Sequence, residues 1–309
     1  ALAAHLVIIV DAVDGDMTAL GNGRRGFVRR GVMEWRGRSY FSCKTNGNFP
    51  ENPERFGLPT IQGMLILSDA DDGRVLAVMD SAEITALRTG AATAVAARYL
   101  ARSDAEDVTI VGCGVQGRVQ LRALAEVLQI RRVFAYDVDF DRAMTYAREM
   151  SDLMGMSVEA ERDLATAAAR ADVCVTCTTG SGFVLDAGMI RAGTFVAGVG
   201  VYNEHKRELA PKLLGTASKV VTDLRTQCAA IGDLHHAIAA QQISLSDVHA
   251  DLADIVAGKR PGREAEHELI VFDSTGLAIQ DVAAAAAIYE NALLEEHAPG
   301  IGALRVTFS

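Results

Sequence analysis

One segment, residues 108–137, most restricts how this chain can fold. It reads VTIVGCGVQGRVQLRALAEVLQIRRVFAYD: a short apolar run, a glycine-punctuated turn, an amphipathic stretch and a second apolar run that ends on an acid. Gly112 permits a tight turn, Gly114 lets a phosphate approach the backbone, and Gly117 lets a helix pack closely on a sheet. The N–H groups at the start of such a helix attract phosphate oxygens. The segment therefore predicts a βαβ unit that binds a dinucleotide.

The acid that closes this segment indicates which dinucleotide is bound. Asp137 ends the second apolar run, where a carboxylate can bind ribose hydroxyls and repels a 2′-phosphate, so NAD(H) is favoured over NADP(H). Arg142 lies close enough in sequence to soften that preference. The loops TTGSG (178–182) and GVGVYNEHK (198–206) follow further apolar runs and are candidates for contacts with the nicotinamide half.

Strand and helix signals alternate beyond this unit. Apolar strands are predicted near 173–178, 194–201 and 219–222, and HELIVFDSTG predicts another buried strand. Helices are predicted over 139–154 and 244–258, and a long alanine-rich helix is predicted near the end of the chain. Such alternation is typical of a parallel doubly wound sheet, in which ligands gather at the carboxyl ends of the strands.

The residues before the glycine segment predict antiparallel structure. RSYFSCKTNGN (38–48) alternates polar and apolar residues, as in a strand with Tyr40, Ser42 and Lys44 on one face. Spacing alone favours a solvated Lys44, because lysine is rarely buried. Residues 61–80 predict two strands joined by an Asp-Asp-Gly hairpin.

A helix is predicted to follow this hairpin, from an N-cap at Asp80 to about Arg102, with Glu83 placed to complete a capping box. Arg88 lies among alanines rather than carboxylates, although a structural ion pair is the more common role of an arginine. By helical spacing, the apolar stripe of this helix is expected to consist of Ile84, Leu87, Ala91 and Val95.

Composition excludes several function classes. With 309 residues, half of them hydrophobic, the chain can form two domains. A net charge of −10 without a basic stripe argues against nucleic-acid binding. Five cysteines form no small disulfide framework, which favours a cytoplasmic protein, and Cys174 and Cys177 would point to opposite faces of a strand. No apolar run is long enough to cross a bilayer. His235 and His236 have no accompanying ligand set, so no metal site is expected.

Several segments in order resemble the ornithine cyclodeaminase and mu-crystallin family. The segment LPTIQGMLILSDADDGRVLAVMDSAEITALRTGAATAVAARYLAR, followed by VGCGVQGR, carries the resemblance, and ADVCVTCTT, GTFVAGVG, IGDLHH and VFDSTG extend it. The resemblance covers residues 40–290. It implies a homodimer of α/β chains, with a Rossmann doubly wound parallel sheet (104–270) inserted into a discontinuous α+β substrate-binding and dimerisation domain (1–103 with 271–309).

The resemblance also implies site residues. Lys44 resembles the active-site lysine of the family, and Arg88 resembles the arginine that binds the substrate carboxylate bidentately. A second carboxylate-binding arginine is expected upstream, at Arg36 or Arg38. Where cyclodeaminases carry an aspartate, this chain has Tyr202, and a phenol cannot take up a proton near neutral pH as a carboxylate can. The expected cofactor-binding residues are Thr89, Gly112, Gly114, Val115, Gln116, Gly117, Asp137, Thr178, Thr179 and Gly200.

These implications favour an NAD(H)-dependent oxidoreductase that transfers a hydride at the α-carbon of an amino acid or its imine. Lys44, Arg88 and Tyr202 are the expected catalytic residues of this amino-acid dehydrogenase or imine reductase. An ornithine-type cyclodeaminase, which uses NAD catalytically and releases ammonia, is the alternative, and a non-catalytic nucleotide- or ligand-binding protein is a second one. The expected partners are a small amino or imino acid and a second copy of the chain, with no nucleic acid, membrane or metal.

Overall fold

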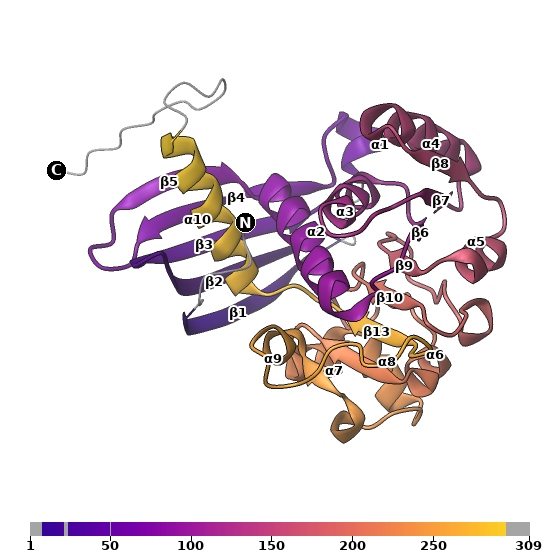
Figure 1. Ribbon diagram of the computed structural model, residues 1–309. Helices are drawn as coiled ribbons and strands as arrows, with labels where there is room; N and C mark the ends of the chain where they lie inside the picture. Colours follow the sequence, from indigo (N-terminus) through magenta and orange to yellow (C-terminus); the bar gives the residue numbers. More distant parts are fainter. Residues whose placement is uncertain (1–7, 22–23, 50, 295–309) are drawn as a thin grey trace. The chain divides into compact units, whose positions relative to one another are not determined.

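The computed structural model describes residues 8–21, 24–49 and 51–294 (Figure 1). These residues form two compact units, which are described separately. Unit 1 consists of the residues up to Arg88 together with those from Leu277 onward, and unit 2 is Thr89–Gly276.

Unit 1 is built on a five-stranded antiparallel sheet in which the strands follow one another in chain order. The predicted hairpin over residues 61–80 is confirmed, with Gly73 at a φ of +77° in its turn. A short helix, α1 (Asn52–Phe56), lies between the third and fourth strands. The strands are β1 (Ile8–Gly21), β2 (Arg24–Trp35), β3 (Arg38–Asn48), β4 (Ile61–Asp69) and β5 (Val75–Asp80).

The alanine-rich helix α10 (Ala278–Leu294) covers one face of this sheet (Figure 1). Small side chains allow the close approach: a Cβ on Gly31 of β2 would lie 3.0 Å from Val282 Cγ2. Further along the helix, Glu290 accepts hydrogen bonds from Tyr40 Oη at 2.7 Å and Trp35 Nε1 at 3.2 Å. The buried core between helix and sheet contains Met33, Trp35, Tyr40, Leu65, Leu67, Ile84, Val282, Ala285 and Ala286.

The alternation in β3 is confirmed, but the environment predicted for Lys44 from spacing is wrong. Tyr40, Ser42, Lys44 and Asn46 share one face, and each is at most 2 % exposed. Their face points toward the interior of unit 1 rather than toward solvent, because α10 covers it. Lys44 therefore belongs to a buried polar cluster, which requires partners for its charge.

Unit 2 contains an eight-stranded sheet in the order β12-β11-β13-β10-β9-β6-β7-β8, with every pair of neighbours parallel. The central strands are buried throughout, which explains their nearly continuous apolar sequences. The predicted parallel doubly wound sheet is confirmed. Its strands are β6 (Asp107–Val111), β7 (Arg132–Tyr136), β8 (Ser157–Ala160), β9 (Val173–Thr176), β10 (Phe195–Gly198), β11 (Lys219–Thr222), β12 (Ala250–Asp251) and β13 (Ile270–Asp273).

Helices alternate with these strands, but the single helix predicted over 244–258 is wrong. That segment contains a short 3-10 turn, then β12, then α9, because Ala250 pairs with Val221 and the His249 N–H bonds to the Val220 carbonyl at 2.9 Å. Pairing with the sheet edge overrides the helical pattern. The α-helices of unit 2 are α3 (Val115–Ala125), α4 (Phe140–Met154), α5 (Leu164–Arg170), α6 (Pro211–Thr216), α7 (Arg225–Ile231), α8 (Asp233–Ala239) and α9 (Leu252–Val256).

Helix α2 (Ser81–Leu100) begins in unit 1 and ends in unit 2. The expected N-cap is confirmed, since Asp80 Oδ1 accepts the Ala82 N–H at 2.7 Å. The predicted apolar stripe is wrong, because Leu87 and Val95 are 43 % and 39 % exposed. The helix instead buries small residues, and a Cβ on Gly90 would lie only 2.8 Å from Val119 Cγ1 in unit 2. Close backbone approach thus decides which side of the helix is buried.

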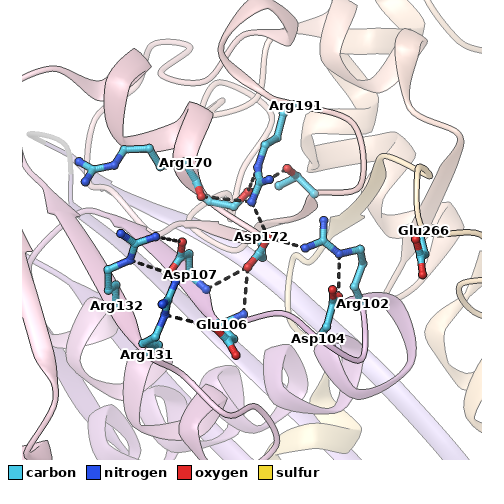
Figure 2. A network of polar contacts seen from close by, with 12 residues as sticks. Arg102, Asp104, Glu106, Asp107, Arg131, Arg132, Arg170, Asp172, Arg191 and Glu266 are labelled. Carbon is cyan, nitrogen blue, oxygen red and sulfur yellow. Dashed lines mark hydrogen bonds and ion pairs between the residues drawn. The ribbon is translucent and has the colours of Figure 1, made fainter.

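A network of charges surrounds Asp172, which immediately precedes β9 (Figure 2). Its carboxylate is 7 % exposed and accepts from Arg102 Nη2 at 2.7 Å and also from Arg191. It also accepts the backbone N–H groups of Glu106 at 2.9 Å and Asp107 at 3.0 Å. One side chain therefore joins two arginines to the beginning of β6.

Replacing Asp172 with alanine should destabilise unit 2 by about 3 kcal/mol, because two arginines and two backbone N–H groups lose their shared acceptor. Urea unfolding followed by circular dichroism would measure this loss. Asp104→Ala is the matched control, since Asp104 pairs with the same Arg102 but is 75 % exposed, so no measurable change is expected. An equal loss of unfolding free energy in the two variants would contradict the expectation that the buried carboxylate contributes more to stability.

Candidate active site

The glycine turn between β6 and α3 has the geometry that a bound phosphate requires. Gly112 has a φ of +106°, and a Cβ there would lie 2.9 Å from the Cys177 carbonyl oxygen. A Cβ on Gly117 would overlap the Gly112 carbonyl oxygen, which explains the third glycine. Gly114 is exposed at the start of α3, and no atom lies within 4 Å of where its Cβ would be. The backbone at Gly114 is therefore open to a ligand.

Asp137 lies beside this turn, at the end of β7. Its Oδ2 accepts the Cys113 N–H at 2.9 Å and its Oδ1 accepts the Asp139 N–H at 3.1 Å. Arg142 Nη1 lies 3.6 Å from the same Oδ1, so the arginine noted in the sequence contacts the acid. The carboxylate and the open glycine backbone together fit the ribose and pyrophosphate of a dinucleotide.

Glu208, which belongs to no motif identified in the sequence, organises the loops that follow β9 and β10. Its Oε1 accepts the Thr178 hydroxyl at 2.7 Å and also the Thr178 N–H, while its Oε2 accepts Thr176 Oγ1 and the Gly200 N–H, each at 2.9 Å. The side chain is fully buried. A Cβ on Gly200 would overlap the Glu208 carboxylate, so this glycine was the only sequence signal of the contact.

Two more buried carboxylates fix the backbone next to Glu208. Asp233 Oδ1 accepts the N–H groups of Glu208 at 2.8 Å and Leu209 at 3.0 Å, and Asp273 Oδ2 accepts the Leu234 N–H at 2.8 Å. Burial raises the pKa of Asp273 to about 7, and burial together with the Asp273 charge raises the pKa of Asp233 well above its usual range. The IGDLHH and VFDSTG segments therefore serve to hold loops at the carboxyl ends of the strands.

Tyr202 lies on the exposed side of the loop after β10, with 40 % of its surface accessible. Lys206 Nζ lies 4.9 Å from the centre of its ring and donates to the Thr178 carbonyl oxygen. Asn203 Oδ1 accepts the N–H groups of His205 at 3.0 Å and Lys206 at 3.1 Å. Asn203 thus shapes the turn, and Tyr202 is the exposed polar ring that this turn presents.

In unit 1, a second polar cluster brings Lys44 of β3 and Arg88 of α2 onto one carboxylate. Lys44 Nζ lies 2.6 Å from Asp281 Oδ2 and donates to Thr85 Oγ1 at 3.1 Å. Arg88 Nε lies 3.3 Å from Asp281 Oδ1, and Arg88 Nη1 donates to Gln280 Oε1 at 2.9 Å. Lys44, Arg88 and Asp281 are 0 %, 8 % and 1 % exposed. The two residues expected to act together are therefore neighbours.

The charges of this cluster act strongly on Lys44. Burial and the charge of Arg88 lower the pKa of Lys44 to about 7, although Asp281 opposes the change. Arg29 lies directly across from Lys44 on β2, and its charge lowers the pKa further. The two upstream arginines considered from the sequence lie elsewhere: Arg36 pairs with Glu290 at 3.3 Å, and Arg38 pairs with Asp69 at 2.8 Å. Arg29 is thus the upstream arginine beside Lys44.

Two arginines and a lysine gather at this cluster. Arg29 and Arg88 lie beside Lys44, and guanidinium groups suit the binding of an anionic group such as a substrate carboxylate. Gln280 and Asp281 were missed in the sequence because they lie at the start of an apolar, alanine-rich helix. Within the described residues, no group of three histidine, cysteine or acidic side chains is arranged to hold a metal ion.

The profile of the ornithine cyclodeaminase/mu-crystallin family matches residues 31–296. The chain belongs to this family. An alanine dehydrogenase from Archaeoglobus fulgidus is 40 % identical over 254 residues, which cover 82 % of this chain and 77 % of that enzyme. The family and the fold class predicted from the sequence are therefore confirmed.

Two solved structures are similar to this chain. The Thermococcus litoralis Δ1-pyrroline-2-carboxylate reductase, in complex with NADH and L-proline, has a TM-score of 0.86 and 33 % identity, covering 92 % of this chain and 88 % of that one. An archaeal alanine dehydrogenase dimer with bound NAD has a TM-score of 0.84 and 36 % identity, covering 94 % of this chain and 87 % of that one.

Substitutions at Gly114 and Gly117 should have different effects, one on cofactor binding and the other on stability. Gly114→Ala should fold as the wild type does, because its methyl group meets open space. If the pyrophosphate binds here as expected, the methyl group would lie in its space and weaken NADH binding by about tenfold or more. Gly117→Ala should instead lower the melting temperature, because its methyl group overlaps a backbone oxygen. NADH fluorescence titration and thermal unfolding measure the two effects. Wild-type NADH affinity in Gly114→Ala would contradict the assignment.

Proposed function

We propose that this chain is an NAD(H)-dependent oxidoreductase that transfers a hydride at the α-carbon of a small amino acid or its imine. The observation that carries the proposal is the buried pair of Lys44 and Arg88, which share the carboxylate of Asp281. The named relatives, an alanine dehydrogenase and a pyrroline-2-carboxylate reductase, belong to the reaction class expected from the sequence. A net dehydrogenase or imine reductase fits better than a cyclodeaminase, because Tyr202 replaces the family's aspartate.

Unit 2 would bind the cofactor. NAD(H) supplies or accepts the hydride when it is bound, and two relatives of known structure hold NADH or NAD. The open backbone at Gly114 and the start of α3 would hold the pyrophosphate, while Asp137 would bind the adenosine ribose. The further proposed cofactor contacts are Thr89, Gly112, Val115, Gln116, Gly117, Thr178, Thr179 and Gly200.

Unit 1 would bind the substrate and move its proton. Arg88, aided by the charge of Arg29, would bind the substrate carboxylate, because a guanidinium matches its two oxygens. Lys44 Nζ can give a proton to the substrate nitrogen or take one from it near neutral pH, since its pKa is about 7. Tyr202 would contribute a hydroxyl group that hydrogen-bonds without changing charge.

The direct test mixes the purified protein with NADH and either cyclic imino acids or α-keto acids plus ammonia. Oxidation of NADH is the expected result, and amino acids with NAD should drive the reverse reaction. Ammonia release from ornithine or lysine with only catalytic NAD, and without net NADH, would instead identify a cyclodeaminase. Turnover in none of these assays would overturn the proposal and leave a nucleotide- or ligand-binding protein.

The pH dependence should report the ionisation of Lys44. In the reductive direction, kcat/KM should fall as the pH rises through about 7, because Lys44 then loses the proton that it donates. Lys44→Met should lose about 100-fold or more in kcat and should lose this limb of the profile. Retained NADH affinity in the variant serves as the control for folding of unit 2. An unchanged profile in Lys44→Met would exclude Lys44 as the proton donor.

We also propose that a second copy of the chain covers the outer face of the sheet in unit 1. Side chains alternate along the strands, so the face opposite α10 presents Met64, Ile66 and Val78, which are 52 %, 36 % and 52 % exposed. Val28 of β2 adds to the same face and is 41 % exposed. An archaeal alanine dehydrogenase relative is a dimer. An apolar sheet face of this kind is typical of a surface that another protein covers.

Introducing charged side chains on this outer face of the sheet should dissociate the dimer. Ile66→Glu combined with Val78→Glu should convert a dimer into a monomer in light scattering, because the charges would lie inside the interface. Phe56→Glu is the matched control: this apolar residue on α1 is 60 % exposed and lies outside the sheet, so the dimer should persist. A wild-type chain that is monomeric at micromolar concentration would contradict the proposal.

We propose a cytoplasmic location on the basis of the cysteines. All five cysteines are free thiols, and four of them are buried. Such thiols persist in a reducing compartment. None of the helices that the structure describes is long and apolar enough to cross a membrane.

A further inference from the structure

We infer that Asp281 is a positioning residue, which holds Lys44 Nζ in place and determines how strongly it keeps its proton, while fixing the plane of Arg88. The inference deepens the proposed function and rests on it, because it assigns a role within the same substrate site. Asp281 itself would contact the lysine and the arginine rather than the reacting atoms.

The carboxylate of Asp281 contacts both Lys44 and Arg88. Asp281 Oδ2 lies 2.6 Å from Lys44 Nζ, while Asp281 Oδ1 lies 3.3 Å from Arg88 Nε. The three side chains come from α10, β3 and α2, and Asp281 is 1 % exposed. A carboxylate removed from water in this way interacts with neighbouring charges far more strongly than a surface carboxylate does.

Asp281 and Thr85 together hold the Lys44 ammonium group in place. The Thr85 hydroxyl donates to the Ser81 carbonyl oxygen at 2.7 Å, so its oxygen is turned to accept from Lys44 Nζ at 3.1 Å. The Thr85 oxygen orients one N–H bond of the ammonium group, and the Asp281 carboxylate, 2.6 Å from Nζ, holds its charge in place.

The same carboxylate also holds Arg88. Asp281 contacts its Nε, and the neighbouring Gln280 accepts from its Nη1 at 2.9 Å. Gln280 is itself held, because its Oε1 accepts the Leu277 N–H at 3.2 Å. Two consecutive residues of α10 therefore fix the guanidinium plane, which a bidentate contact with a substrate carboxylate requires.

Each element packed around Lys44 contributes to its electrostatic environment. β2 contributes the cation Arg29, α2 contributes the cation Arg88, and β4 places the neutral Leu65 opposite Lys44. Among the residues that the structure describes, Asp281 of α10 contributes the charge that favours the ammonium form. Without this carboxylate, two cations and burial would all favour the neutral amine.

A purely structural role is the competing explanation, since Asp281 also joins α10 to the sheet. That role predicts lower stability without any change in the proton affinity of Lys44. The pH dependence of turnover separates the two explanations, because it reports the proton affinity rather than the strength of packing.

The test is Asp281→Asn, which keeps the shape and removes the charge. The basic limb of the reductive kcat/KM profile should move to lower pH by about one to three units, because a contacting opposite charge is lost. Glu290→Gln is the matched control: Glu290 also joins α10 to the sheet, through Tyr40 and Trp35, but it does not contact Lys44. It should lower the melting temperature and leave the limb in place.

A folded Asp281→Asn with an unmoved limb would overturn the inference. If Asp281→Asn does not fold, Gln280→Glu decides instead: it adds a charge beside Arg88 with little change of shape and should move the limb to higher pH, whereas an unmoved limb again overturns the inference. If the wild-type protein shows no turnover, the proposed function fails. If it turns over but the basic limb of the kcat/KM profile has the same pH in the variants, only the role of Asp281 is refuted.

Discussion

The ion pairs of Asp281 with Lys44 and Arg88 are the interaction on which unit 1 depends. Burying a lysine and an arginine is costly unless a counter-charge accompanies them, so the sheet, α2 and α10 must meet at one point. The alanines of α10 and Gly31 of β2 make that approach possible, because a Cβ on Gly31 would already lie 3.0 Å from Val282 Cγ2. The packing of the unit and the reactivity of its lysine therefore share one cause.

In unit 2, buried carboxylates hold the loops at the carboxyl ends of the parallel strands. Glu208, Asp233 and Asp273 are fully buried, and each accepts backbone N–H groups. Hydrogen bonds of this kind stabilise a carboxylate in the interior and fix the loops at the same time. The glycine turn is held by a carboxylate as well, because Asp137 accepts the Cys113 N–H, and the backbone at Gly114 stays open.

The errors of the sequence-based predictions share a physical origin. The helix expected over 244–258 gives way to β12 because an edge strand gains hydrogen bonds from β11 that a helix could not form. The apolar stripe of α2 is misplaced because Gly90 and its small neighbours allow a closer contact than Leu87 would. Lys44 has the alternation of a solvated strand lysine, but α10, which arrives from the other end of the chain, covers that face.

The sequence by itself determined the glycine turn, most of the strands and helices after residue 38, the family, and Lys44 and Arg88 as candidates. These features are encoded by local spacing and by short motifs, which neighbouring residues complete. Only the tertiary structure identified Asp281, Arg29 and Glu208, because each acts on residues that are distant in sequence or lie on another strand. The partners of a buried charge are set by tertiary packing. Packing brings together elements that are far apart in the sequence, so no local sequence pattern predicts their contact.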